Sequence, residues 1–348
     1  MIKTYKYLDS VHGKLHEFVI AFFNRIEFET GDFDDAFFDP EFLVIVKRHP
    51  KVLRQRCKEI YNAIRGWDQN DRSTLCKQIR ESNEIENICK GNYKPPVIDQ
   101  NNTGVMGLLR ELFMALYNQV LDGKGFRDKY QTKLRDHFDA FSRLNIEITR
   151  CPICGIADLK KHHDETRDQY DHYLPKALYP FSSINFRNLV PSCKECNSFD
   201  AKGAKDTIAI STGRIFFPYD QAHKGIVVEV NVSKDDEKIE NIEWKIKYIS
   251  PDNKKDEVQS WINIYKIKER HLGYIKGRII KWYQLFFNFV NSKSMEGKPP
   301  EDRKEVYLSW LKERENLEIN DFMERPALEG FLNDSTLAQA AIEMKLYS

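Results

Sequence analysis

The sequence predicts an α+β protein that is mainly helical, with a small unit of two strands and a helix near its centre. In the first 90 residues, apolar side chains recur at spacings of three and four, which is typical of amphipathic helices. Between residues 214 and 250 the apolar residues alternate or form short runs, which is typical of strands. Between these two regions, the stretch 151–205 carries two Cys-x-x-Cys pairs, around which the central unit is expected to form.

Length and charge narrow the class of protein. With 348 residues, two or three domains with buried cores are expected. The 54 basic and 53 acidic residues give a formal net charge of +1. This balance argues against a protein that coats nucleic acid indiscriminately, although it is compatible with local basic patches. No apolar run is long enough to span a bilayer, and no signal peptide is recognisable, so we expect a cytoplasmic protein without membrane association.

Residues 1–147 are predicted to form a helical support or docking region. One amphipathic helix is expected from the apolar stripe Leu15, Phe18, Val19, Phe22, Phe23 and Ile26. A second should begin at Asp39-Pro40, because Asp caps helices and Pro is favoured in the first turn. The Pro-, Gly- and Asn-rich segment 91–104 predicts a long loop. No catalytic constellation is visible in this region.

Residues 208–348 are predicted to form a few strands followed by helices. The strands are expected at 214–220, 225–233 and 242–250, then one long helix at 261–289 and two further helices at 301–314 and 335–346. The long helix carries a basic outer face that includes Lys276, Arg278 and Lys281. Such a face is either solvated or able to follow a phosphate backbone, and the sequence favours neither reading.

The central region, residues 148–207, reads as strand, long loop, strand, helix. Each of its Cys-x-x-Cys pairs can present two thiolates to one ion, and four thiolates complete the tetrahedron that zinc prefers, without an open position. We therefore predict a structural zinc ion bound by Cys151, Cys154, Cys193 and Cys196. A rubredoxin-like iron centre and a redox Cys-x-x-Cys pair are the alternatives. The other three cysteines, in the helical region, are expected to be buried apolar residues.

Between and just after the cysteine pairs lie residues suited to hydrolysing a phosphodiester. Asp171 offers a hard oxygen ligand for Mg²⁺ or Mn²⁺, and His172 next to it suits a general base. Asn197, directly after Cys196, can supply a second and neutral oxygen ligand. Because neighbours on a strand point to opposite faces, Asp171 and His172 can share a site only if the strand bends or twists.

The order Asp-His, Asn-Leu, then Cys-x-x-Cys-Asn followed by a lysine-glycine tail resembles the HNH, or ββα-metal, endonucleases. The resemblance implies that His172 activates water and that Asp171 and Asn197 bind the catalytic Mg²⁺ or Mn²⁺. It implies that Asn188 braces the loop that carries the base. It also places Lys202 and Lys205 near phosphate.

The family resemblance further implies an endonuclease acting on DNA. Proteins of this general build resemble the HNH nuclease subunits of bacterial anti-phage systems, which implies control by an ATPase or another regulatory protein. Two features depart from the family pattern: the glycine-rich turn after the Asp-His pair is replaced by residues 176–186, and the third motif position is Asn. The alternative function is a non-catalytic zinc module that binds nucleic acid or a protein, in which Asn188 and Asn197 only cap a turn and a helix.

Overall fold

The computed structural model describes residues 1–234, 242–316 and 322–333, and it is a mixed α+β structure, about half helical, with two small antiparallel sheets. Its contacts group into two compact units, each built from separate parts of the chain. The larger unit comprises Thr4–Ile146 and Leu159–Gln221, and the smaller comprises Met1–Lys3, Glu147–Asp158 and Ala222–Ser348. The predicted division into residues 1–147, 148–207 and 208–348 stays a prediction.

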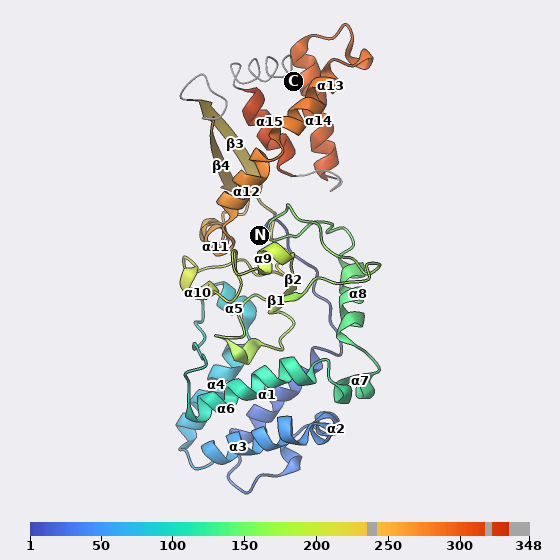
Figure 1. The fold of residues 1–348 in the computed structure, drawn as a ribbon. Coiled ribbons are helices and arrows are strands. Elements are labelled where there is room, and N and C mark those ends of the chain that lie inside the picture. Colours follow the sequence, from blue (N-terminus) through green and yellow to red (C-terminus); the bar gives the residue numbers. More distant parts are fainter. Residues whose placement is uncertain (235–241, 317–321, 334–348) are drawn as a thin grey trace. The chain divides into compact units, whose positions relative to one another are not determined.

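The larger unit is a helical layer that carries the first two strands (Figure 1, blue to yellow-green). Its α-helices are α1 Lys14–Ile26, α2 Pro40–Arg48, α3 Gln55–Ile64, α4 Gln69–Glu81, α5 Ile85–Cys89, α6 Gly104–Ala115, α7 Lys124–Tyr130, α8 Leu134–Leu144, α9 Lys194–Asn197 and α10 Thr207–Ile210. Shorter 3₁₀ or π turns are η1 Asp35–Phe37, η2 Pro50–Arg54, η3 Leu116–Val120 and η4 Pro180–Ser182. The strands are β1 Tyr170–His172 and β2 Leu189–Pro191.

Local sequence explains the first helices of this unit. On α1 the predicted stripe is buried, except that Phe18 is only partly buried. Helix α2 begins where it was predicted, because the Asp39 carboxylate accepts hydrogen bonds from the backbone N–H groups of Glu41 (2.8 Å) and Phe42 (3.3 Å), with Pro40 in the first turn. These helices share one hydrophobic core that also contains Tyr170 of β1 and Leu189 of β2.

The short hairpin is therefore anchored on the helical layer. Strands β1 and β2 pair antiparallel, with Asp171 opposite Val190 and His172 opposite Leu189. Between the strands, η4 packs on α6, and the Ser183 hydroxyl donates a hydrogen bond to the Phe113 carbonyl oxygen (2.9 Å). A two-stranded sheet of this length is not stable alone, so its packing on α6 fixes the position of β1.

The smaller unit contains the second hairpin and the last helices (Figure 1, yellow-brown to red). Its elements are β3 Val227–Lys234, β4 Ile242–Ile249, α11 Lys255–Tyr265, α12 Ile267–Lys276, α13 Ile279–Val290, η6 Lys293–Met295, α14 Pro300–Asn316 and α15 Glu324–Leu332. Helix α15 packs against β3, and its Gly330 lies so close to the Val230 carbonyl oxygen that a Cβ atom would clash. A second hydrophobic core joins this hairpin to α12–α15.

Two predicted elements of the C-terminal region were wrong. The single helix expected at 261–289 is three helices, because Lys266 adopts a left-handed conformation (φ 50°) at the end of α11 and Arg278 leaves helical geometry (φ −129°) before α13. The strand expected at 214–220 belongs to neither sheet in the described chain, although Ile215, Phe216 and Tyr219 are buried there. The helix predicted at 335–346 lies outside the described residues.

Among the residues described, no helix combines the length and the apolar character needed to cross a membrane.

Candidate functional site

The cysteines predicted to bind zinc form one buried cluster. The Sγ atoms of Cys151, Cys154, Cys193 and Cys196 all lie within 4.8 Å of one another. Four buried sulfur ligands at this spacing match the tetrahedral set that a structural ion such as zinc takes, so the donor chemistry fits the predicted metal. The remaining cysteines are buried as expected, and burial raises the pKa of the Cys76 thiol to about 12.

Backbone contacts shape both cysteine turns. Gly155 donates to the Cys151 carbonyl oxygen (2.6 Å) and has a positive φ of 73°, a conformation that glycine adopts without strain. The Cys193 Sγ accepts a hydrogen bond from the Cys196 backbone N–H (3.4 Å) at the start of α9. These turns bring the sulfurs at positions i and i+3 of each pair to the same side of the chain.

Side chains outside the predicted set support the first cysteine turn. The Trp261 indole Nε1 donates to the Ile153 carbonyl oxygen (2.7 Å), and the His271 Nε2 lies 2.9 Å from the Cys154 carbonyl oxygen. Both side chains are buried and come from α11 and α12. The sequence predicts a helix with an apolar face and a basic outer face for this segment, but the contacts of Trp261 and His271 with the cysteine turn depend on the tertiary fold.

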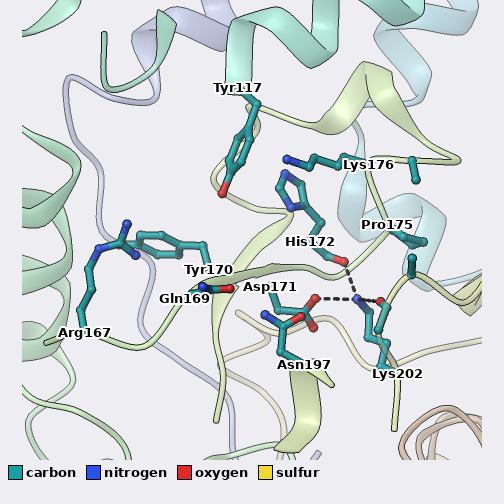
Figure 2. Close-up of a pocket in the computed structure, with 13 residues that line it drawn as sticks. Tyr117, Arg167, Gln169, Tyr170, Asp171, His172, Pro175, Lys176, Asn197 and Lys202 are labelled. Atoms are coloured by element: carbon teal, nitrogen blue, oxygen red, sulfur yellow. Dashed lines mark hydrogen bonds and ion pairs between the residues drawn. The ribbon is translucent and has the colours of Figure 1, made fainter. Parts of the chain in front are cut away.

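The larger unit contains a cavity of about 500 Å³ at the β1 strand (Figure 2). Asp171, His172 and Asn197 all line it, so the structure brings together three of the four residues predicted to be catalytic. The fourth, Asn188, is fully buried and does not belong to the residues that line the cavity. Asp171 and His172 share the cavity although they are neighbours on a strand, as the prediction required.

His172 is held in one orientation. Its Nε2 lies 3.0 Å from the Ser183 carbonyl oxygen, which can only accept, so Nε2 carries the proton and Nδ1 keeps its lone pair. In the described part of the chain, Nδ1 has no hydrogen-bond partner. The Tyr117 ring packs edge-on against the imidazole, with centroids 4.4 Å apart. Burial, and to a lesser extent the nearby Lys176 ammonium, lowers the pKa of His172 to about 3, so the ring is neutral near pH 7.

Asp171 is buried, and its two carboxylate oxygens differ in their contacts. Its Oδ1 forms an ion pair with the Lys202 ammonium at 2.6 Å, whereas Oδ2 is buried and has no hydrogen-bond partner among the residues that the structure describes. Burial raises the pKa of the Asp171 carboxyl, and Lys202 acts in the opposite direction. An orphaned carboxylate oxygen beside the Asn197 amide, in one polar cavity, fits a hard divalent cation that keeps most of its ligands as water.

Lys202 was predicted to lie near phosphate, but it is not a surface residue. Its side chain is fully buried, and the ammonium also donates to the His172 carbonyl oxygen (2.6 Å). The structure therefore makes Lys202 a brace that joins α9's trailing loop to β1. Lys205 is only partly buried, and its ammonium bonds to the Ala201 carbonyl oxygen.

Asn188 makes the contacts that a bracing role requires. Its Oδ1 accepts from the Leu174 backbone N–H (2.7 Å), and its Nδ2 donates to the carbonyl oxygens of Leu174 (3.0 Å) and Ser182 (3.2 Å). Leu174 lies two residues after His172, and Ser182 directly precedes the Ser183 carbonyl that binds the imidazole. One amide thus ties both sides of the loop that orients His172.

The cavity also contains residues that the sequence did not single out. Lys176 places its ammonium 4.0 Å from the centroid of the Tyr117 ring and donates to the Asn118 Oδ1 (2.9 Å). Arg167 lines the opposite part of the cavity, with its guanidinium 5.6 Å from the Tyr170 ring centroid. Lys176 follows His172 by four residues, but the sequence does not mark it as a cavity residue, and Tyr117 comes from a helical region in which the sequence indicates no site.

The predicted basic residues of the smaller unit are exposed. Lys276 ends α12, and Arg278 and Lys281 lie at the start of α13. The Arg278 guanidinium stacks on the Tyr274 ring at 3.7 Å. Their part in binding nucleic acid stays a prediction.

Comparison with known proteins finds two partial similarities. The chain is 34% identical over 64 residues to Septu protein PtuB of Bacillus thuringiensis, which covers 18% of this chain and 23% of PtuB. It is 44% identical over 48 residues to protein ea31 of Escherichia phage lambda, which covers 14% of each chain. No family model and no solved structure matches. This weak homology reaches less than a quarter of either relative.

Proposed function

We propose that this protein is a metal-dependent endonuclease of the HNH type that hydrolyses phosphodiester bonds in DNA. The observation that carries the proposal is the cavity itself: it is lined by His172, whose Nε2 is bonded to the Ser183 carbonyl oxygen, and by Asp171 and Asn197, which offer oxygen ligands. A base beside hard oxygen ligands is the donor set that hydrolysis of a phosphodiester requires.

In this proposal His172 takes a proton from water at Nδ1 while the oxygen of that water attacks phosphorus. The Ser183 carbonyl holds the protonated Nε2, so the ring accepts the proton without turning. A divalent Mg²⁺ or Mn²⁺ ion, when bound by Asp171 and Asn197, supplies positive charge for the phosphate and for the leaving 3′-oxygen. Lys176 and Arg167 line the same cavity, and in this proposal they bind the phosphate that is cleaved.

The similarity to a Septu defence protein supports an anti-phage role for this activity. We propose that a regulatory protein, such as an ATPase, controls the nuclease. The isolated chain would then cleave slowly, and addition of the partner would raise the rate. The resemblance to HNH nuclease subunits of anti-phage systems supports such control.

Cleavage of a supercoiled plasmid with Mg²⁺ or Mn²⁺, and then with EDTA, tests the chemistry. We expect divalent-dependent cleavage by the wild type and none by His172→Ala, with zinc quantified in both preparations. His172→Gln is the matched variant, because its amide nitrogen takes the place of Nε2 and can still donate to the Ser183 carbonyl oxygen, whereas the amide cannot act as the base. Full divalent-dependent cleavage by His172→Ala would refute the assigned role.

The zinc measurement separates the alternatives. A colourless preparation that contains zinc excludes the rubredoxin-like centre, since such iron sites are coloured. Zinc with salt-sensitive DNA binding and no cleavage, under any divalent ion and with the partner present, would instead favour the non-catalytic module.

A further inference from the structure

Phe199 is an exposed aromatic residue beside the candidate active site. Its side chain is 81% exposed, the highest value among the large hydrophobic residues of the described chain. Single exposed apolar residues are common, so exposure alone says little. The position of Phe199 is more informative: it follows Asn197 by two residues and precedes Lys202, and both of those residues line the cavity.

The loop that presents Phe199 is held by its own hydrogen bonds. The Ser198 hydroxyl donates to the Glu195 carbonyl oxygen (2.8 Å), and the Ala201 N–H donates back to the Ser198 carbonyl oxygen (3.2 Å). Beyond it the buried Lys202 ammonium ties the loop to β1. Gly203 has φ of 50°, and a Cβ atom there would come within 2.9 Å of the Phe199 Cα, so the loop closes tightly on a glycine.

A cation stands next to the exposed ring. The Lys205 ammonium lies 6.0 Å from the centroid of the Phe199 ring, at the outer limit of a cation–π contact. An aromatic face beside a basic side chain is the arrangement by which proteins bind single-stranded nucleic acid: the base stacks on the ring and the phosphate meets the cation. Burying the ring against a base also removes apolar surface from water.

We propose that Phe199 stacks on an unpaired base of the substrate strand close to the bond that is cleaved. The inference rests on the proposed nuclease function and adds a substrate class to it: DNA with an unpaired base near the scissile phosphate is preferred over a continuous duplex. A duplex has to open at that step before the ring can reach a base face.

The chain geometry limits where that base lies. Only Ser198 lies between Asn197 and Phe199, so their Cα atoms are at most about 7.6 Å apart. The backbone of Phe199 therefore lies close to that of Asn197, and a fluorescent base analogue is best placed about two or three nucleotides from the cleaved bond.

The test measures binding in the full-length His172→Ala background, so that the DNA stays intact. Single-stranded and duplex oligonucleotides carry 2-aminopurine two or three nucleotides from the cleaved bond that the wild type defines. We expect quenching with the single strand, and a five- to 150-fold weaker affinity for Phe199→Ala, the range that corresponds to about 1–3 kcal/mol for one stacked base. Phe199→Trp should retain binding, because its ring also stacks.

Two further variants make the result specific. Phe199→Leu keeps an apolar side chain without a stacking face and should lose affinity as Phe199→Ala does. Phe28→Ala is the matched control: Phe28 is also an exposed phenylalanine of the larger unit, at 67%, and lies outside the cavity lining, so its loss should leave binding unchanged.

The outcomes distinguish this inference from the function on which it rests. If the wild type neither binds nor cuts DNA, the proposed function fails. If it binds and cuts while Phe199→Ala binds equally well, only the stacking role is refuted. Full binding by Phe199→Leu overturns stacking in favour of an apolar contact, and an equal loss on duplex and single strand overturns the preference for an unpaired base.

Discussion

Replacement of Asn188 by alanine is expected to loosen the loop that orients His172. The Asn188 side chain forms hydrogen bonds to Leu174 and Ser182, all of them buried. The variant leaves the Leu174 N–H buried without a partner, which costs about 1–3 kcal/mol, and removes two good amide donations worth about 1 kcal/mol each. We therefore expect Asn188→Ala to lower the free energy of unfolding by at least about 3 kcal/mol, the lower end of the sum of these terms.

Asn185→Ala is a matched control from the same loop. Asn185 is also buried and also bonded, with its Nδ2 donating to the Asn83 carbonyl oxygen (2.9 Å) and its Oδ1 accepting from the Arg187 N–H (3.0 Å). It makes fewer bonds, so we expect a loss of about 2 kcal/mol. None of its partners lies next to His172, so any effect on the site should be small.

Chemical denaturation gives the two free energies, and hydrogen exchange locates the change. In Asn188→Ala the Leu174 amide should exchange faster by about two orders of magnitude, since 1.4 kcal/mol is tenfold. In Asn185→Ala it should exchange at the rate of the wild type, after correction for global stability. Cleavage should fall more in Asn188→Ala than in the control. Equal exchange of the Leu174 amide in both variants would show that Asn188 does not hold this loop.

Three further predictions concern buried charge, pH and metal. Lys202→Met leaves the Asp171 carboxylate buried and unpaired, which should cost about 3–5 kcal/mol, and Asp171→Asn in the same chain should recover part of the loss in thermal melts. Burial lowers the pKa of His12 to about 4 in the folded protein, below the value of about 6.5 in the unfolded chain. As the pH falls below 6.5, the unfolded chain therefore takes up a proton at His12 before the folded protein does, and the free energy of unfolding decreases. Between pH 7 and 5 this amounts to about 2 kcal/mol, and His12→Asn should flatten that part of a stability–pH curve. Cys193→Ser should reduce the zinc content and the melting temperature together, and an unchanged zinc content would contradict the assigned ligands.

Much of the fold follows from local sequence because its signals are local. The α1 stripe and the Asp39-Pro40 start of α2 each depend on a few consecutive residues. The failure at 261–289 has the same origin: the apolar spacing continues from Tyr265 to Ile267, so nothing in the pattern marks the break at Lys266. The left-handed conformation of Lys266 depends on tertiary packing, and the periodicity of apolar residues carries no information about it.

The candidate site divides in the same way. Cys-x-x-Cys spacing predicted the four-sulfur cluster because the turn that joins i and i+3 is local. The walls of the cavity were not predictable, because they come from distant parts of the sequence: Tyr117 lies 55 residues before His172 (172 − 117). The burial of Lys202 was missed for a related reason. A lysine near a glycine is expected at the surface, and only the structure shows that Asp171 pairs with this one in the interior.

Buried hydrogen bonds around His172 explain how a strand of three residues can keep its side chains in a fixed geometry. Strand β1 has three residues, and an isolated hairpin of that size does not persist in water. Hydrophobic packing holds it on the helical layer but does not fix the direction of a single side chain. Directional bonds do: Lys202 fixes the His172 carbonyl, Asn188 fixes Leu174, and the Ser183 carbonyl fixes the imidazole. Each bond is buried, so breaking any one leaves a polar group without water to replace it. Substitutions in this network should therefore disturb the geometry of the site as well as lower stability, whereas substitutions in the α1 stripe should lower stability and leave these directional bonds in place.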